Sequence, residues 1–183
     1  MGQETILSGL KHPHGLAIDP QDPDTLYFAE ETKISKVTIA PTGHGPVQKI
    51  IDLPGGGNHF SRTIGFGPDG RLYVSIGSTC NVCYEEDARR ASIWSLNKDG
   101  SDFKEVAGGL RNSVFFVWNN RDGKMWATDM GRDLLGDDIP PDEINIIDTR
   151  SANILNFGWP NCYGKNIHDD AFDKNTYFRN PCM

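Results

Sequence analysis

Three passages of the chain share one order of segments: a short apolar strand, a tight turn, a second strand, a loop and a third strand. Aligning Tyr27, Tyr73 and Trp126, which stand in the second strand of each passage, gives a repeat of roughly 50 residues, the length of a β-propeller blade. No segment shows helical periodicity over about 11 residues or more. We therefore predict an all-β fold built from propeller blades.

The turns between these strands indicate antiparallel hairpins. Pro68-Asp69-Gly70 and Asp122-Gly123 are turn sequences, because glycine adopts positive φ and aspartate bonds to its own backbone. The flanking runs are short and rich in aromatic and β-branched residues, as in antiparallel strands. A β-sandwich is the alternative fold, but its strands rarely repeat one turn-and-aromatic pattern at a fixed period.

The number of blades is small for a closed ring. We expect one domain over residues 1–183, with blades at about 5–53, 54–108 and 109–155 and a loop-rich tail at 156–183. Propellers close with about four to eight blades, whereas this chain holds about three to three and a half at the repeat length given above. The sequence thus predicts part of a larger ring, whose open edges favour self-assembly.

Composition excludes several kinds of partner. The net charge is −7 and the isoelectric point is about 5.1, which argues against nucleic acid and against anionic membranes. No run of about 18 apolar residues is present, so we expect no membrane span. The start, Met1 to Glu4, has neither the basic nor the apolar region of a signal peptide. A small molecule is the expected ligand.

The four cysteines favour disulfide bonds. Cys80 and Cys83 form a C-x-x-C, and Cys162 and Cys182 lie in a loop-rich tail. A zinc site would need a second closely spaced pair, and a thioredoxin-like site would need the C-x-x-C to open a helix. Structural disulfides in an oxidising compartment are therefore the preferred interpretation.

Two loops carry candidate ligand-binding residues. His59 follows three glycines, which allow close approach of a ligand, and imidazole is the usual general base near neutral pH. Arg111 and Asn112 stand at the corresponding place before the third blade, where a guanidinium suits a ligand with several carboxylates. The alternatives are a loop histidine bonded to a neighbouring carbonyl and an arginine packed between blades.

The segment Gly131 to Asn145 combines five carboxylates with glycines and prolines. Such a loop resembles a calcium site, although its spacing is not that of an EF-hand. A solvated acidic loop is the alternative.

Several of these motifs together resemble the glucose/sorbosone dehydrogenase family of soluble six-bladed quinoprotein propellers, over roughly residues 5–165. The motifs are His59 with Arg62-Thr63, Gly67-Pro68-Asp69-Gly70, Leu110-Arg111-Asn112, and Gly131-Arg132-Asp133 through Asn145. The segment Ser78 to Cys83 and the loop Gly136 to Pro141 are similar to the sorbosone-dehydrogenase-like branch.

The resemblance implies a cofactor, a metal and roles for five residues. His59 would be the general base that takes the proton of a sugar hydroxyl while hydride passes to pyrroloquinoline quinone. Arg111 and Asn112 would contact the quinone, and the carbonyls of Gly131 and Arg132 would hold calcium. The Arg111 guanidinium and the calcium ion would both stabilise charge that develops on the quinone oxygens.

We therefore expect a periplasmic or secreted enzyme that oxidises an aldose or sorbosone-like sugar and passes electrons to an acceptor that the sequence does not identify. The alternative is a non-catalytic propeller fragment that serves as a binding or scaffolding module. Further basic cofactor-binding residues of the family belong to later blades, which these 183 residues do not contain.

Overall fold

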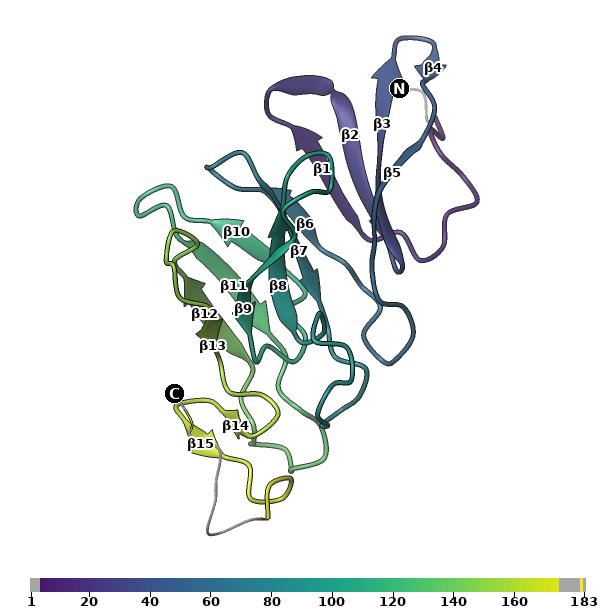
Figure 1. Cartoon of the computed structure of the whole chain (residues 1–183). Coiled ribbons are helices and arrows are strands. Elements are labelled where there is room, and N and C mark those ends of the chain that lie inside the picture. Colours follow the sequence, from purple (N-terminus) through teal and green to yellow (C-terminus); the bar gives the residue numbers. More distant parts are fainter. Residues whose placement is uncertain (1–3, 175–181, 183) are drawn as a thin grey trace.

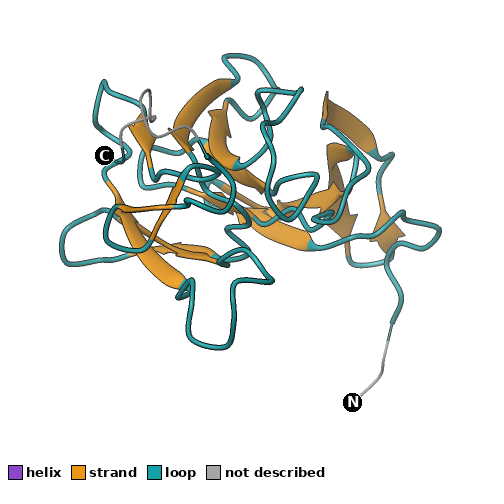
Figure 2. Cartoon of the chain, turned by 90° about the horizontal axis from the view of Figure 1, so that it is seen from below, coloured by secondary structure: helices purple, strands orange, loops and turns teal. Residues whose placement is uncertain are grey.

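The computed structural model describes residues 4–174 and 182. Every regular element among these residues is a strand, and Figure 2 shows strands joined by loops alone. The predicted all-β class is confirmed. No helix long and apolar enough to cross a membrane occurs among the described residues.

Hydrogen bonds group most strands into three larger sheets, which follow one another along the chain (Figure 1). The first sheet consists of β1 (Gly15–Asp19), β2 (Asp22–Glu30), β3 (Lys33–Ala40), β4 (Gly43–His44) and β5 (Gln48–Asp52). The second contains β6 (Ile64–Phe66), β7 (Leu72–Ile76), β8 (Ser92–Leu96) and β9 (Lys104–Gly108). The third consists of β10 (Phe116–Trp118), β11 (Met125–Asp129) and β12 (Glu143–Ile147).

The chain then returns to the second sheet. The short strand β13 (Leu155–Asn156) pairs in parallel with β9, beyond the complete third sheet in sequence. A separate two-stranded hairpin, β14 (Cys162–Tyr163) with β15 (Ile167–His168), follows. The edge of the second sheet is therefore covered by a strand that lies 47 residues or more beyond β9 in the sequence, counted from 108 to 155.

The predicted turns join β6 to β7 and β10 to β11. In the first, Gly70 has a φ of 77° and donates its N–H to Gly67 O, while Asp69 Oδ1 accepts from Arg71 N at 3.1 Å. In the second, Gly123 has a φ of 69°. Both glycines adopt the left-handed region, which residues with a Cβ rarely enter.

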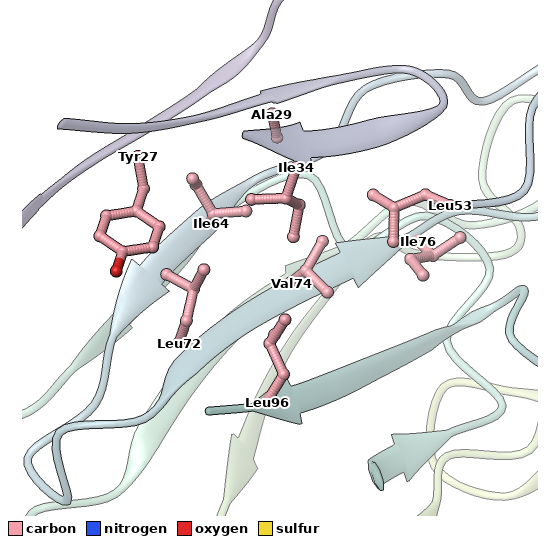
Figure 3. Close-up of a cluster of buried hydrophobic side chains, with 9 residues drawn as sticks. All are labelled: Tyr27, Ala29, Ile34, Leu53, Ile64, Leu72, Val74, Ile76 and Leu96. Carbon is pink, nitrogen blue, oxygen red and sulfur yellow. The ribbon is translucent and has the colours of Figure 1, made fainter. Parts of the chain in front are cut away.

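The core lies between the sheets and is centred on β7, all five residues of which are buried. Side chains alternate along a strand, so Leu72, Val74 and Ile76 face the first sheet while Tyr73 faces the third. Figure 3 shows the first of these layers, to which Tyr27 and other residues of the first sheet contribute. Apolar burial on both faces of the second sheet fixes the order of the three sheets.

The third sheet has one covered face and one open face. Val117 pairs with Trp126, and Trp126 with Ile146, so these side chains form a row on one face. They are 65%, 38% and 47% exposed, whereas Tyr73, at the matching place in the second sheet, is 1% exposed. The difference arises because the third sheet covers Tyr73, while the described residues leave the row at Trp126 open.

Candidate functional site

Four loops meet at one end of the sheets, toward β14 and β15 in Figure 1. They are residues 53–63, 77–91, 109–115 and 130–142. Backbone hydrogen bonds tie each loop to the next: Asn58 N to Thr79 O (2.9 Å), Ser78 N to Arg111 O (2.8 Å) and Met130 N to Asn112 O (3.3 Å). The loops that carry the sequence-predicted residues therefore form one connected site.

Ser78 sets the tautomer of His59. The imidazole Nδ1 lies 3.0 Å from Ser78 O and 2.9 Å from Ser78 Oγ. Ser78 Oγ donates its only proton to Cys80 O at 2.7 Å, so toward His59 both serine oxygens are acceptors. The proton of the neutral ring is therefore on Nδ1, and the lone pair of Nε2 is available.

Burial lowers the pKa of His59, and the positive charge of Arg111 lowers it further. The pKa thus lies below the ordinary value of 6.5, so the ring is mainly neutral at pH 7. A half-buried, neutral imidazole with an unprotonated Nε2 can accept a proton.

Gly77 leaves the space that lets His59 and Asn112 lie close together. A Cβ at Gly77 would lie 2.6 Å from the Cβ of His59 and 2.6 Å from Oδ1 of Asn112. These distances are too short for a real side chain, so only glycine allows both residues to flank this point. The two candidate residues are therefore neighbours.

All three guanidinium nitrogens of Arg111 donate hydrogen bonds to oxygen atoms of this chain. Nε donates to Asn81 O, Nη1 to the carbonyls of Met130 and Gly131, and Nη2 to Asn81 Oδ1 and Asp133 Oδ2. The residue is 3% exposed. Its charge acts on the site, but its donors are engaged by backbone and side-chain oxygens of this chain.

Asp129, at the end of β11, anchors the backbone of the Arg111-Asn112 pair. Its Oδ2 accepts from Arg111 N at 3.0 Å and its Oδ1 from Asn112 N at 2.8 Å. Burial raises the pKa of Asp129 to about 7, although the two N–H bonds oppose this shift. A buried carboxyl group thus fixes the main chain on which both candidate ligand residues stand.

Gly131 and Arg132 lie beside Arg111 and are already bonded. Gly131 N donates to Asp142 Oδ1 at 2.9 Å, and Gly131 O accepts from Arg111 Nη1 at 2.8 Å. Arg132 Nη1 donates to Asp169 Oδ2 at 2.9 Å in a largely buried ion pair. The loop is therefore tied both to the guanidinium and to the C-terminal tail.

This arrangement does not fit a calcium ion. A cation on Gly131 O would meet the guanidinium that donates to the same oxygen, and like charges in a half-buried site repel strongly. The carboxylates of 131–145 also do not gather. Among the described residues, the one cluster of three metal-ligating side chains is Cys80, Cys83 and Glu85, whose cysteines are disulfide-bonded.

Both expected disulfides are present. Cys80 is bonded to Cys83 and Cys162 to Cys182. The described residues contain no free cysteine. The zinc interpretation, which needs thiolates, is not supported, and neither is the thioredoxin-like one, because no helix begins at the C-x-x-C in the described structure.

Glu31 fixes the glycine loop that precedes His59. Its Oε1 accepts from Gly56 N at 2.6 Å and its Oε2 lies 2.9 Å from His12 Nδ1. The bond from Gly56 N, followed by that to His12, lowers the pKa of Glu31 to about 2. The carboxylate therefore stabilises the fold above about pH 4.5, and this contribution is lost as the pH falls toward 2.

Replacing Glu31 with glutamine is expected to lower the urea midpoint at pH 7, because the amide bonds Gly56 N more weakly than the carboxylate does. The difference from the wild type should narrow between pH 4.5 and about 2, where the carboxylate becomes protonated. The exposed Glu86→Gln variant serves as the control. An equal midpoint at pH 7 would show that Glu31 does not hold the loop.

Three residues of the site have roles that the sequence motifs did not predict: Ser78, Asn81 and Asp129. Ser78 lies 19 residues from His59, and no pattern links the two. Asn81 stands inside the C-x-x-C, a motif that points to its two sulfurs and predicts no role for the residue between them. Asp129 had a usable signal, because it continues the buried alternation of Met125 and Ala127 on β11. A carboxyl group at such a position needs buried partners.

The sheets and loops define a partial β-propeller of the type found in sugar oxidoreductases. A family model described as TrAA12-like matches residues 2–179, and the chain belongs to this family. The match confirms the family relationship expected from the sequence motifs.

Solved structures share the fold. The holo form of the pyranose dehydrogenase PQQ domain from Coprinopsis cinerea is 16% identical with a TM-score of 0.78, over 99% of this chain and 50% of that chain. The family AA12 enzyme of Trichoderma reesei is 23% identical with a TM-score of 0.75, over 96% and 50%. The PQQ-bound aldose sugar dehydrogenase of Streptomyces coelicolor is 18% identical with a TM-score of 0.63, over 97% and 69%.

Part of the chain also matches a curated relative in sequence. An uncharacterized protein of Borreliella burgdorferi is 39% identical over 112 residues, which are 59% of this chain and 28% of that protein. The chain thus spans 28% of this relative and about half of the first two solved structures. The predicted partial propeller is confirmed by this coverage.

Proposed function

We propose that this chain provides the general-base side of a site that oxidises an aldose or sorbosone-like sugar with pyrroloquinoline quinone. The observation that carries the proposal is the fixed tautomer of His59, which leaves Nε2 unprotonated on a ring that the charge of Arg111 reaches. The PQQ-bound and holo states of two structural neighbours support the choice of cofactor.

Each residue has a distinct task in this proposal. His59 Nε2 takes the proton of the sugar hydroxyl, and Ser78 holds the ring so that the imidazolium that forms keeps two acceptors at Nδ1. Arg111 provides a fixed positive field that favours an anionic ligand. The quinone, when bound, supplies the hydride acceptor.

Calcium is not assigned a step. A calcium structure of the Trichoderma reesei family AA12 enzyme supports calcium for that protein. In this chain the Gly131 carbonyl is bonded to Arg111, and a metal at Gly131 and Arg132 would require that bond to break. We therefore restrict the calcium proposal to a form in which Arg111 has moved.

A second candidate function is a non-catalytic propeller module. The observation that favours it is the complete engagement of the Arg111 donors, which leaves no guanidinium N–H for the carboxylates of a ligand. A binding or scaffolding role would need the fold but no quinone.

Titration of the purified chain with pyrroloquinoline quinone, with and without calcium, separates these candidates. Micromolar binding and reduction of an artificial electron acceptor with a panel of aldoses would support the enzyme. If the chain neither bound the quinone nor reduced the acceptor, the catalytic proposal for this chain would be wrong, and the non-catalytic binding or scaffolding role would be favoured.

We further propose one domain over 1–183 with blades at 5–53, 54–108 and 109–155 and a tail at 156–183. Two disulfides support an oxidising compartment, periplasmic or extracellular. Proteolysis under non-reducing conditions that released a stable sub-fragment would contradict the single domain.

Replacing Ser78 with alanine is expected to lower the rate of sugar oxidation about fivefold, because one hydrogen bond of about 1 kcal/mol that orients His59 is lost. The backbone acceptor Ser78 O remains, so the loss should be partial. Steady-state rates with the exposed Ser8→Ala variant as the control test this. An unchanged rate would show that Ser78 O alone fixes the ring.

A further inference from the structure

The turn closed by the Cys80–Cys83 disulfide lies directly against Arg111. Asn81, inside this turn, accepts from Arg111 twice: its backbone O from Nε at 2.9 Å and its Oδ1 from Nη2 at 3.0 Å. No other residue among those described bonds two of the guanidinium nitrogens through separate oxygens on this side. The turn therefore determines the direction in which the guanidinium points.

Asn81 also holds the segment after Gly131. Its Oδ1 accepts from Asp133 N at 2.7 Å, and its Nδ2 donates to Asp133 O at 3.0 Å. This reciprocal pair requires an amide, because a carboxylate has no donor and a serine is too short to reach both groups. One side chain thus connects the disulfide turn, Arg111 and the loop of residues 130–142.

Each of the remaining partners of Arg111 bonds a single nitrogen, and the shortest of these bonds runs from Nη1 to Gly131 O at 2.8 Å. Asp133 forms an ion pair with Nη2 at 3.0 Å, but its side chain is 72% exposed, and exposed ion pairs add little stability. The Met130 carbonyl is 3.4 Å from Nη1. Among the described residues, Asn81 is consequently the one that bonds two different nitrogens of the guanidinium.

The disulfide gives the turn its rigidity. Next to Cys80, Thr79 is fixed by Glu85, which accepts from Thr79 N and from Thr79 Oγ1 at 2.7 Å each. Ser78, whose Oγ donates to Cys80 O, is the residue that orients His59. The base and the guanidinium are thus held by one short covalently closed segment.

We propose that Asn81, presented by the Cys80–Cys83 disulfide, is a positioning residue that fixes the Arg111 guanidinium on the His59 side of the site. For its ligand the proposal rests on the proposed function, since a prearranged cation is useful for binding an anionic quinone. The positioning itself is a property of the chain without any ligand. Opening the disulfide or shortening Asn81 should release Arg111.

The test follows the Arg111 Nη2 hydrogens in low-temperature arginine side-chain ¹H–¹⁵N spectra of the ligand-free chain, because Nη2 donates to Asn81 Oδ1, whereas Nε donates to the backbone O that every residue at this position has. Asn81→Ala is expected to raise the hydrogen-exchange rate of the Nη2 hydrogens at least tenfold, and Asn81→Asp, which keeps a side-chain acceptor oxygen, should remain within threefold of the wild type. Val82→Ala, in the same turn, is the matched control. The dissociation constant for pyrroloquinoline quinone should rise at least tenfold in Asn81→Ala.

A second measurement opens the disulfide without touching Asn81. The Cys80→Ser/Cys83→Ser double variant, which keeps Cys162–Cys182, should also accelerate exchange of the Arg111 side-chain N–H groups, and it decides the case if Asn81→Ala does not fold. Unchanged exchange in folded Asn81→Ala, or in the double variant if Asn81→Ala fails to fold, overturns the proposal. Accelerated exchange in a chain that never binds the quinone would refute the proposed function and leave the positioning role standing.

Discussion

Replacing His59 with asparagine is expected to lower the rate of sugar oxidation by the quinone-loaded chain by about 10²- to 10⁴-fold, the usual contribution of a general base. Asparagine can still donate to Ser78 O, so the loop should keep its conformation. The loss should therefore appear in kcat far more than in the unfolding midpoint. Stopped-flow reduction of the quinone measures it.

The pH profile provides a second readout for His59. The base acts in its neutral form, and its pKa lies below 6.5, so the rate should be level near pH 7 and fall as the solution is acidified through that pKa. His44→Asn, at an exposed residue whose imidazole bonds to Gly45 O, is the control. A His59→Asn variant with wild-type kcat would remove His59 from the mechanism.

Replacing Asp129 with alanine is expected to destabilise the fold by about 2–5 kcal/mol, because two buried N–H groups, those of Arg111 and Asn112, lose their acceptor. Urea unfolding of the variant measures the change. Asp129→Asn should have an intermediate effect, since its amide oxygen can accept from one N–H while its NH₂ group faces the other.

Asp137→Ala, at an exposed position of the 130–142 loop, is the control for Asp129. It should change stability by no more than about 0.5 kcal/mol, as most exposed substitutions do. If Asp129→Ala were equally mild, water would have to replace the carboxylate at both N–H groups, and Asp129 would have no role in holding the Arg111-Asn112 backbone.

The sequence predicted the turns and strands whose conformation depends on neighbouring residues alone. Gly70 and Gly123 mark hairpins because positive φ is a property of single residues. The repeat of Tyr27, Tyr73 and Trp126 located the second strand of each sheet, since alternating burial depends on the strand itself. The exposure of Trp126 did not follow from the repeat, because it depends on what covers the sheet.

The sequence predicted which residues lie near one another at the site, but not which hydrogen-bond partners hold them. Loop positions brought His59 near Arg111 and Asn112, as the order of blades implies. The partners of those side chains come from far along the chain: Ser78 for His59, and Asn81 for Arg111 at a separation of 30 residues. Hydrogen bonds between loops depend on their final conformations, which no sequence spacing encodes.

The parallel pairing of β13 with β9 bears on how the chain unfolds. Repeat proteins whose units contact only their neighbours can lose one unit at a time. Here the second sheet is completed by Leu155 and Asn156, which follow the whole third sheet in sequence. Detaching the third sheet would pull this strand from β9, so we expect hydrogen exchange of β9 and of β10 to β12 to report a single cooperative opening.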